Sequence, residues 1–150
     1  SAASERAPPA RRAGMRPRRG MPRCAIATVA VLVRDYDEAL AFFCDKLGFD
    51  KLSDADLGAG KRWVTIAPAG GKGAALLLAK AATPEQVARI GDQHGGRVGF
   101  FLETDDFARD YAAFTGAGVR FLEPPRHESY GTVAVFVDLY GNRWDLIEPR

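Results

Sequence analysis

The sequence has few of the residues that build covalent cross-links or metal sites. Its 150 residues include two cysteines and two histidines. Cys24 and Cys44 lie in apolar segments with neither CxxC spacing nor a neighbouring histidine, which favours buried, reduced thiols over a disulfide or a zinc site. Reduced thiols in turn favour a cytoplasmic location.

Long apolar runs are also missing. The stretch from Val98 to Leu102 is typical of those present, and it is short and interrupted by glycine, whereas a membrane-spanning helix needs about 20 apolar residues. The sequence therefore predicts no membrane insertion. With 47% hydrophobic and 27% charged residues, the composition is that of a soluble globular protein with one core.

Positive charge is concentrated near the start of the sequence. Residues 1–21 contain six arginines and one glutamate, and since the totals are 21 basic and 19 acidic residues, the remainder has 15 basic and 18 acidic ones. We expect residues 1–22 to form a disordered tail, because their Ala, Pro, Arg and Gly content offers little to bury, and residues 23–150 to form one domain. A nucleic-acid-binding arm is not favoured, since no aromatic residue is interleaved for base stacking. A leader or targeting segment, or a start at Met15 or Met21, is the other interpretation.

The first half of the domain predicts a strand, a helix and three further strands. The run from Thr28 to Val33 is β-branched and apolar, as in a buried strand. A helix capped by Asp35, with Glu38 three residues later, follows and ends at Gly48. Strands are then predicted from residue 51, over 62–67 and over 74–79, separated by glycine-rich turns. A short helix over 83–91 connects to the second half.

The second half repeats this order. A strand over 98–102 precedes a helix capped by Asp105 or Asp106 and a strand over 119–122. Residues 62–67 match 131–136, and Leu76 matches Asp145, at an offset of 69 in the numbering. A repeat of this length predicts two copies of one supersecondary unit, residues 24–80 and 97–149, with chance matching of apolar strands as the alternative. The predicted core includes Phe42, Phe43, Phe100, Phe101, Phe121 and Phe136.

Two segments resemble the vicinal oxygen chelate superfamily, which contains glyoxalases, bleomycin-resistance proteins and extradiol dioxygenases. Residues 29–49, VAVLVRDYDEALAFFCDKLGF, are similar to its opening segment, and residues 130–146 are similar to its closing one. The more specific signal is the turn from Asp138 to Asn142 followed by Asp145; Asp138 itself is expected to shape the turn. The resemblance implies an α+β fold in which two βαβββ modules form a curved mixed sheet around a cleft, completed in a homodimer.

The resemblance also implies where a metal would bind. In the superfamily's enzymes a divalent metal in the cleft is held by a histidine on the first strand of each module and a glutamate or similar ligand on the last, and the substrate chelates the metal through neighbouring oxygens. Here those positions carry Thr28, Val98 or Gly99, Leu76 and Asp145. A tight site needs several converging donors, so we expect no metal, and we expect no other cofactor.

The leading hypothesis is therefore a metal-free small-molecule-binding protein similar to the bleomycin-resistance proteins. The alternatives are a glyoxalase-like lyase or dioxygenase that uses a divalent metal, and a metal-free acid–base enzyme centred on Asp145. Whether the chain is an enzyme stays open at this point. In a dry cleft Asp145 would have a raised pKa and serve as a general base or hydrogen-bond acceptor; otherwise it is a strand-edge carboxylate.

Several other residues are candidates for ligand contacts. Trp63 is interpreted either as the flat wall of an apolar pocket or as core or dimer filling. Arg62 either binds an anionic group or is an exposed strand arginine. Residues 124–130 form a loop at the cleft rim, where polar side chains either contact a ligand or are solvated, and His94 is interpreted as a solvated loop histidine. The candidate ligand-binding residues are Thr28, Arg62, Trp63, His127, Glu128 and Tyr130, with Asp145 as the candidate catalytic residue.

Overall fold

The computed structural model describes residues 16–150, so most of the predicted tail lies outside the described residues, while residues 16–22 are exposed. The elements are β1 (Thr28–Val33), α1 (Tyr36–Leu40), the π-helical η1 (Ala41–Lys46), β2 (Phe49–Gly58), β3 (Lys61–Pro68), β4 (Ala75–Lys80), α2 (Pro84–Ala88), β5 (Val98–Glu103), α3 (Phe107–Gly116), β6 (Arg120–Phe121), β7 (Arg126–Glu128), β8 (Gly131–Val137) and β9 (Arg143–Pro149). The order of strand, helix and further strands thus occurs twice, as the sequence repeat predicts. β7 falls in the stretch expected to be a loop.

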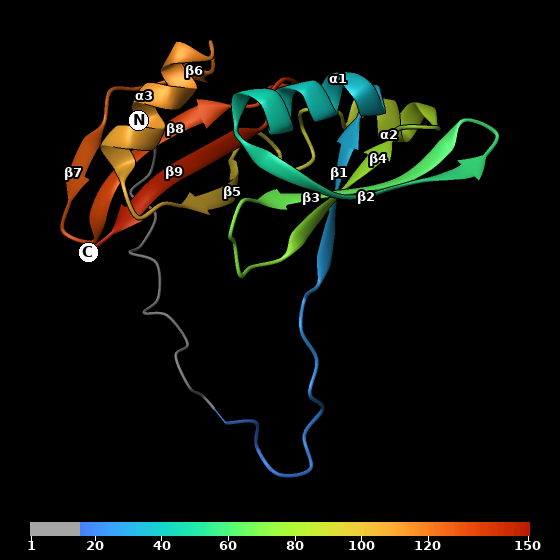
Figure 1. Cartoon of the computed structure of the whole chain (residues 1–150), viewed down its shortest axis with the longest axis horizontal. Helices are drawn as coiled ribbons and strands as arrows, with labels where there is room; N and C mark the ends of the chain where they lie inside the picture. Colours follow the sequence, from blue (N-terminus) through green and yellow to red (C-terminus); the bar gives the residue numbers. More distant parts are fainter. Residues whose placement is uncertain (1–15) are drawn as a thin grey trace.

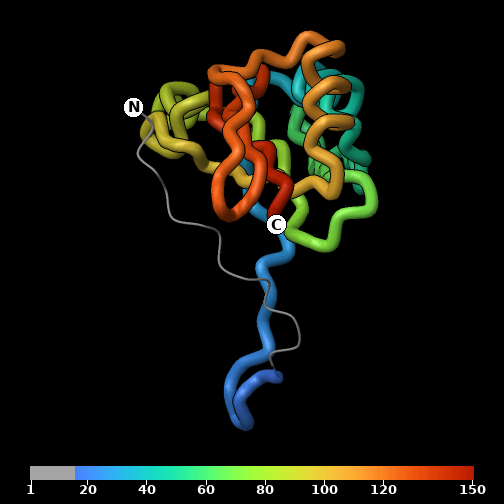
Figure 2. The backbone as a smooth tube through the Cα atoms, turned by 90° about the vertical axis from the view of Figure 1, so that its left-hand side faces the viewer, coloured from blue at the N-terminus to red at the C-terminus, as the bar shows by residue number. Residues whose placement is uncertain are grey.

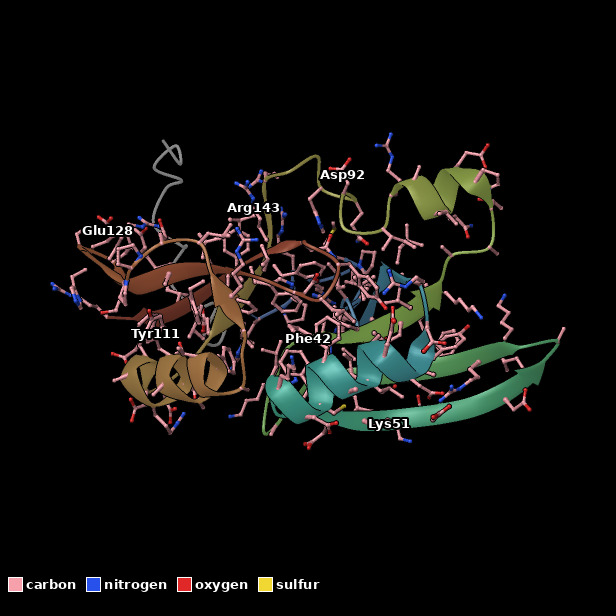
Figure 3. The ribbon with its side chains drawn as sticks, turned by 90° about the horizontal axis from the view of Figure 1, so that it is seen from above. Phe42, Lys51, Asp92, Tyr111, Glu128 and Arg143 are labelled. Carbon is pink, nitrogen blue, oxygen red and sulfur yellow. The ribbon has the colours of Figure 1, made fainter. Side chains whose placement is uncertain are left out.

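The strands form two sheets. Sheet A has the order β1-β4-β3-β2, and sheet B has the order β5-β9-β8-β6, with β7 also paired to β8. In each sheet the first strand of the module runs parallel to the last, and the other pairs are antiparallel. α1 and α3 lie on the same side of the two sheets (Figures 1 and 3). The predicted α+β class with two similar modules is confirmed.

Local signals in the sequence explain the helix boundaries. The Asp35 carboxylate accepts a hydrogen bond from the backbone N–H of Glu38 at 2.9 Å, and Asp106 accepts one from Arg109 at 3.0 Å. Asp106, not Asp105, is therefore the cap of α3. The first helix is π-helical over its second part and is followed by Gly48 at φ 71°, a left-handed conformation that glycine adopts without a steric penalty.

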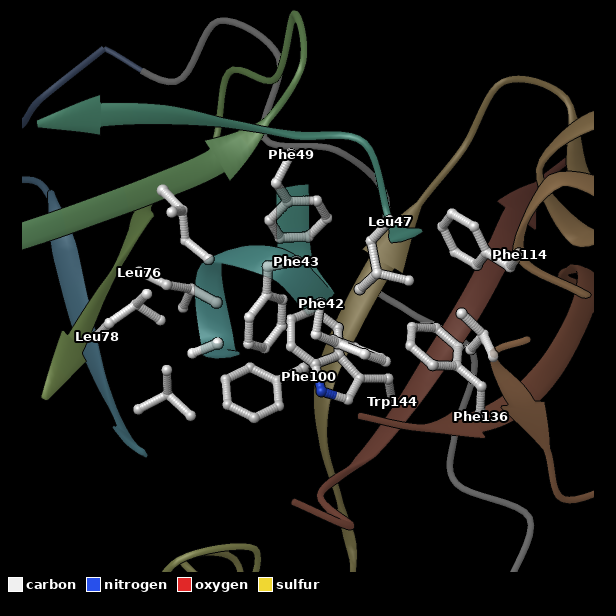
Figure 4. Close-up of a cluster of buried hydrophobic side chains, with 14 of the residues drawn as sticks. Phe42, Phe43, Leu47, Phe49, Leu76, Leu78, Phe100, Phe114, Phe136 and Trp144 are labelled. Atoms are coloured by element: carbon white, nitrogen blue, oxygen red, sulfur yellow. The ribbon is translucent and has the colours of Figure 1, made fainter. Parts of the chain in front are cut away.

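The core lies between the helices and the two sheets and is centred on Trp144, which is 3% exposed. The Trp144 ring stacks on Phe100 with centroids 4.3 Å apart and also contacts Phe43, Phe49 and Phe136 (Figure 4). Phe43 and Phe49 come from the first module, while Phe100, Phe136 and Trp144 come from the second. One aromatic cluster therefore joins the two modules into one core. Of the predicted core phenylalanines, Phe42, Phe43, Phe100 and Phe136 are buried and Phe121 packs against the core partly buried.

Phe101 is the exception, because it is 55% exposed. Adjacent residues of a strand point to opposite faces, so Phe100 and Phe101 cannot both enter the core. The prediction of a core position for Phe101 was wrong.

The expectation of two buried thiols holds only in part. Cys44 is half-buried, but Cys24 is exposed, and both are free. The segment before β1 projects away from the sheets (Figures 1 and 2), which leaves Cys24 without packing partners. Burial raises the pKa of the Cys44 thiol.

Polar contacts also connect the modules. The Tyr140 hydroxyl, in the β8–β9 turn, donates to Glu38 Oε1 of α1 at 2.8 Å, and burial raises the pKa of Tyr140 well above its usual range. Gly91, in the connection between the modules, packs against the carbonyl oxygen of Tyr140. This turn, α1 and the connection are therefore held together at one place.

The connection between the modules also shields one edge of sheet A. The Gln93 side chain accepts a hydrogen bond from the Leu32 N–H at 3.0 Å and donates one to the Ala30 carbonyl at 3.2 Å. Both backbone groups belong to β1, which is an edge strand of sheet A.

His94, in the same connection, was expected to be solvated but is half-buried. The His94 ring contacts the Phe100 ring edge-on, with centroids 5.0 Å apart. A Cβ at position 99 would lie only 2.3 Å from His94 Cγ, so the imidazole occupies the space that a side chain there would need. The absence of a side chain at Gly99 is what makes room for the imidazole.

Candidate functional site

Sheet B presents Asp145 on the face away from the helices. Asp145 of β9 is paired with Phe101 of β5 and Val135 of β8. Paired residues share a face, and neighbours along a strand alternate, so these three side chains lie opposite Trp144 and the core. Asp145 is half-buried, and its Oδ1 atom is shielded from solvent.

The corresponding face of sheet A carries mostly small side chains. Thr28 is exposed beside Ala75, and the hydroxyls of Ser53 and Thr65 are hydrogen-bonded at 2.5 Å. Trp63, 46% exposed, lies on the same face as Thr65 because the two are separated by one residue. Of the predicted residues, the structure therefore places Thr28 and Trp63 on this outer face.

A pocket lies where the two modules meet. It has a volume of about 630 Å³ and is formed by the loop between β3 and β4 and by the end of β5, which lie beside each other in Figure 1. Phe101 links this pocket to Asp145, its partner across the β5–β9 pair. The lining residues are Ala67, Pro68, Gly70, Gly71, Lys72, Gly73, Ala74, Phe101, Leu102 and Glu103.

Arg62 is directed away from this outer face. Its guanidinium donates to both carboxylate oxygens of Asp54 and, at 2.9 Å, to Asp37 in the first turn of α1. It also lies 5.1 Å from the centre of the Tyr36 ring. The Arg62 hydrogen bonds lower the pKa of Asp54. Arg62 thus stabilises the contact between α1 and β3 on the helix side of sheet A.

The polar candidates His127 and Glu128 lie on opposite faces of sheet B, and Tyr130 lies in the turn between β7 and β8. His127 pairs with Thr132, whose hydroxyl is 3.2 Å from His127 Nδ1, and this pair is on the opposite face from Asp145 because Thr132 and Val135 are three residues apart. Glu128 is on Asp145's face, but it pairs with Gly131, about 13 Å along β8 from Val135, at the far end of the sheet (Figure 3). Its carboxylate binds Arg126 at 2.9 Å.

The alignment of Leu76 with Asp145 was wrong. Leu76 is 9% exposed and belongs to the core, whereas Asp145 faces away from it. In the β3–β4 hairpin Thr65 pairs with Leu77. In the β8–β9 hairpin Val135 pairs with Asp145 in the same way. Leu77, not Leu76, is therefore the structural counterpart of Asp145. A shift of one residue exchanges the two faces of a strand, and sequence matching alone did not resolve that shift.

The side chains at the four positions where the superfamily's enzymes carry metal ligands do not fit a divalent metal. Asp145 brings one carboxylate and Thr28 one hydroxyl, while Leu77 and Gly99 bring no ligand atom. Within residues 16–150 there is no group of three or more His, Cys, Asp or Glu side chains placed to hold a metal ion. Tight binding of a transition metal needs several such donors at one point.

Residues 25–146 match the Glyoxalase/Bleomycin resistance protein/Dioxygenase superfamily. The chain belongs to this superfamily, so the resemblance noted in the sequence is confirmed. None of the helices in the described part of the chain has the length and apolar character needed to cross a membrane.

Individual proteins are similar to the chain over most of its length. The chain is 51% identical to an uncharacterized protein of Shewanella frigidimarina over 83% of its own length and 93% of the relative. It is also similar to the crystal structure of UcmS2, with 30% identity, a TM-score of 0.73 and coverage of 84% and 98% of the two chains. A second similar structure is TnmS3, an antibiotic binding protein from Streptomyces sp. CB03234, with 30% identity, a TM-score of 0.69 and coverage of 87% and 99%.

Proposed function

We propose that this protein binds an aromatic small molecule, without a metal, in the pocket between the β3–β4 loop and β5. The observation that carries the proposal is an exposed aromatic ring, Phe101, in the wall of a pocket of about 630 Å³. Ligand pockets combine a concave, largely apolar lining with a few polar groups. Pro68 extends the apolar wall, and Asp145 brings a carboxylate beside Phe101. The likeness to TnmS3, described as an antibiotic binding protein, supports this class of ligand.

The test uses N-phenyl-1-naphthylamine, an uncharged aromatic dye whose fluorescence rises in apolar surroundings. We expect saturable binding to the wild-type protein and an approximately tenfold higher Kd in Phe101→Ala, because covering a phenylalanine side chain contributes about 1.5 kcal/mol or more. Leu139→Ala is the matched control, since Leu139 is exposed in the β8–β9 turn and does not line the pocket. No saturable binding, or equal binding by all three proteins, contradicts the proposal.

The same titration separates binding from the metal-dependent alternative. After treatment with EDTA the protein is expected to keep its Kd, and elemental analysis of protein purified without a chelator should find no stoichiometric transition metal. A metal that is bound by the wild type and lost in Asp145→Ala would instead favour a lyase or dioxygenase. An acid–base enzyme centred on Asp145 would need a turnover that depends on that carboxylate.

We further infer that a second copy of the chain covers part of the outer faces. Trp63 is 46% exposed there, and exposed aromatic surface of this kind is typical of interaction sites. Light scattering is expected to give twice the chain mass of 16.2 kDa. A mass of one chain that persists at high protein concentration would contradict the homodimer.

A further inference from the structure

The loop between β3 and β4 is rich in glycine and carries one basic side chain. Residues 69–74 read Ala-Gly-Gly-Lys-Gly-Ala, and five of them line the pocket together with the end of β3. Gly70 has φ 66°, and a Cβ added at Gly73 would meet no atom within 4 Å. Without side chains at these glycines, a ligand can approach the loop backbone closely. Lys72 is the cationic residue of this lining.

Lys72 differs in its partners from three arginines of the fold. Arg62, Arg109 and Arg126 each contact two carboxylates, and none of the ion pairs between residues of the described part of the chain involves Lys72. Glu103, the acidic residue of the lining, already takes part in an interaction of its own. The charge at the glycine-rich side of the pocket is therefore positive.

The exposed aromatic ring of the same pocket comes from the other module. Phe101 belongs to β5 in the second module, whereas Lys72 belongs to the first. A ligand that contacts both sides must carry a flat apolar part toward β5 and its polar group toward the β3–β4 loop. An ammonium pairs with an anionic group through a charge-assisted hydrogen bond, which is stronger than a neutral one.

We propose that the ligands of this pocket are aromatic anions, such as carboxylates, sulfonates or phenolates, and that Lys72 binds their charged group. This inference rests on the proposed binding function and adds the ligand's charge to it. Lys72 is thus a specificity-determining residue: it selects among aromatic compounds by charge, while Phe101 contributes to the binding of all of them.

Two dyes with the same aromatic body test the inference. 1-Anilinonaphthalene-8-sulfonate carries a sulfonate that N-phenyl-1-naphthylamine lacks. We expect Lys72→Met to raise the Kd of the sulfonate about tenfold, the size of one charge-assisted contact, and to leave the Kd of the uncharged dye unchanged. Lys72→Arg should retain most of the affinity for the sulfonate. Lys80→Met is the matched control, because Lys80 is also exposed, at the end of β4, and lies outside the pocket lining.

The outcomes separate this inference from the proposed function. Charge selection is overturned if Phe101→Ala weakens both dyes while Lys72→Met weakens neither, or weakens both equally. An effect of Lys80→Met as large as that of Lys72→Met would also overturn it, because the sulfonate would then respond to overall charge only. If Phe101→Ala affects neither dye, the pocket itself is not the binding site and the proposed function fails.

Discussion

Replacing Trp144 with alanine is expected to lower the free energy of unfolding by about 3–5 kcal/mol, the range measured for removal of a buried large aromatic side chain. Trp144 is 3% exposed, and its ring contacts aromatic rings from both modules. The substitution also removes the hydrogen bond from Trp144 Nε1 to Asp138 Oδ2, which is 3.0 Å long. Since small proteins are stable by about 5–15 kcal/mol in total, the variant should unfold at a much lower urea concentration.

Two matched substitutions separate the loss of aromatic packing from the loss of the hydrogen bond to Asp138. Trp144→Phe keeps an aromatic ring but loses the indole N–H. Asp138 Oδ2 keeps the hydrogen bond from Asn142 Nδ2 at 2.9 Å, so the variant should cost about 1.5–3 kcal/mol, the contribution of one hydrogen bond to a carboxylate. Trp63→Ala removes the same side chain from an outer face where it is 46% exposed. At protein concentrations low enough to keep the chain monomeric, it should change the free energy of unfolding by less than about 1 kcal/mol. Equal losses for Trp144→Ala and Trp63→Ala in urea unfolding would show that the aromatic cluster does not join the modules as described.

Replacing Gly91 with alanine is expected to cost about 3 kcal/mol, because steric overlap and backbone strain add together. A Cβ at this position would lie 1.9 Å from the carbonyl oxygen of Tyr140, and φ is 76°. The clash involves backbone, so it cannot be relieved by rotating a side chain. The contact between the β8–β9 turn and the connection should therefore open, and thermal unfolding should begin at a lower temperature.

Gly95 provides the control for backbone strain. It has φ 66°, and a Cβ there would meet nothing within 4 Å, so Gly95→Ala should cost only about 1 kcal/mol. A Gly91→Ala variant no less stable than Gly95→Ala would contradict the close approach of Gly91 and Tyr140.

The fold was predictable because its signals are local and repeated. Asp35 caps its helix as its spacing to Glu38 indicates, and the Asp138 turn forms with the carboxylate accepting the N–H groups of Tyr140 and Asn142 at 3.0 Å. These interactions span only a few residues, so the sequence pattern contains them. The helix cap, the turn and the alternation of apolar residues together indicate the two modules.

The candidate site was harder to predict because it depends on strand faces and long-range pairing. An offset of 69 matched Leu76 to Asp145, but the two hairpins differ in length: Ile66 pairs with Leu76, ten residues later, whereas Phe136 pairs with Trp144, eight residues later. The same uncertainty placed Phe101 in the core. Strand alternation was the available signal, since two adjacent phenylalanines cannot face one side. The glycine-rich loop was identified only as a turn, because its position beside β5 is a property of the tertiary structure.

The two hydrogen bonds of Gln93 also affect the tendency of the protein to aggregate through the β1 edge of sheet A. An unprotected edge strand offers its N–H and carbonyl groups to any extended peptide and can seed growth of a sheet from one molecule to the next. Here the carboxamide of Gln93 takes the place of that peptide along the second half of β1. A side chain from the connection between the modules thereby protects this edge of sheet A from pairing with a strand of another molecule.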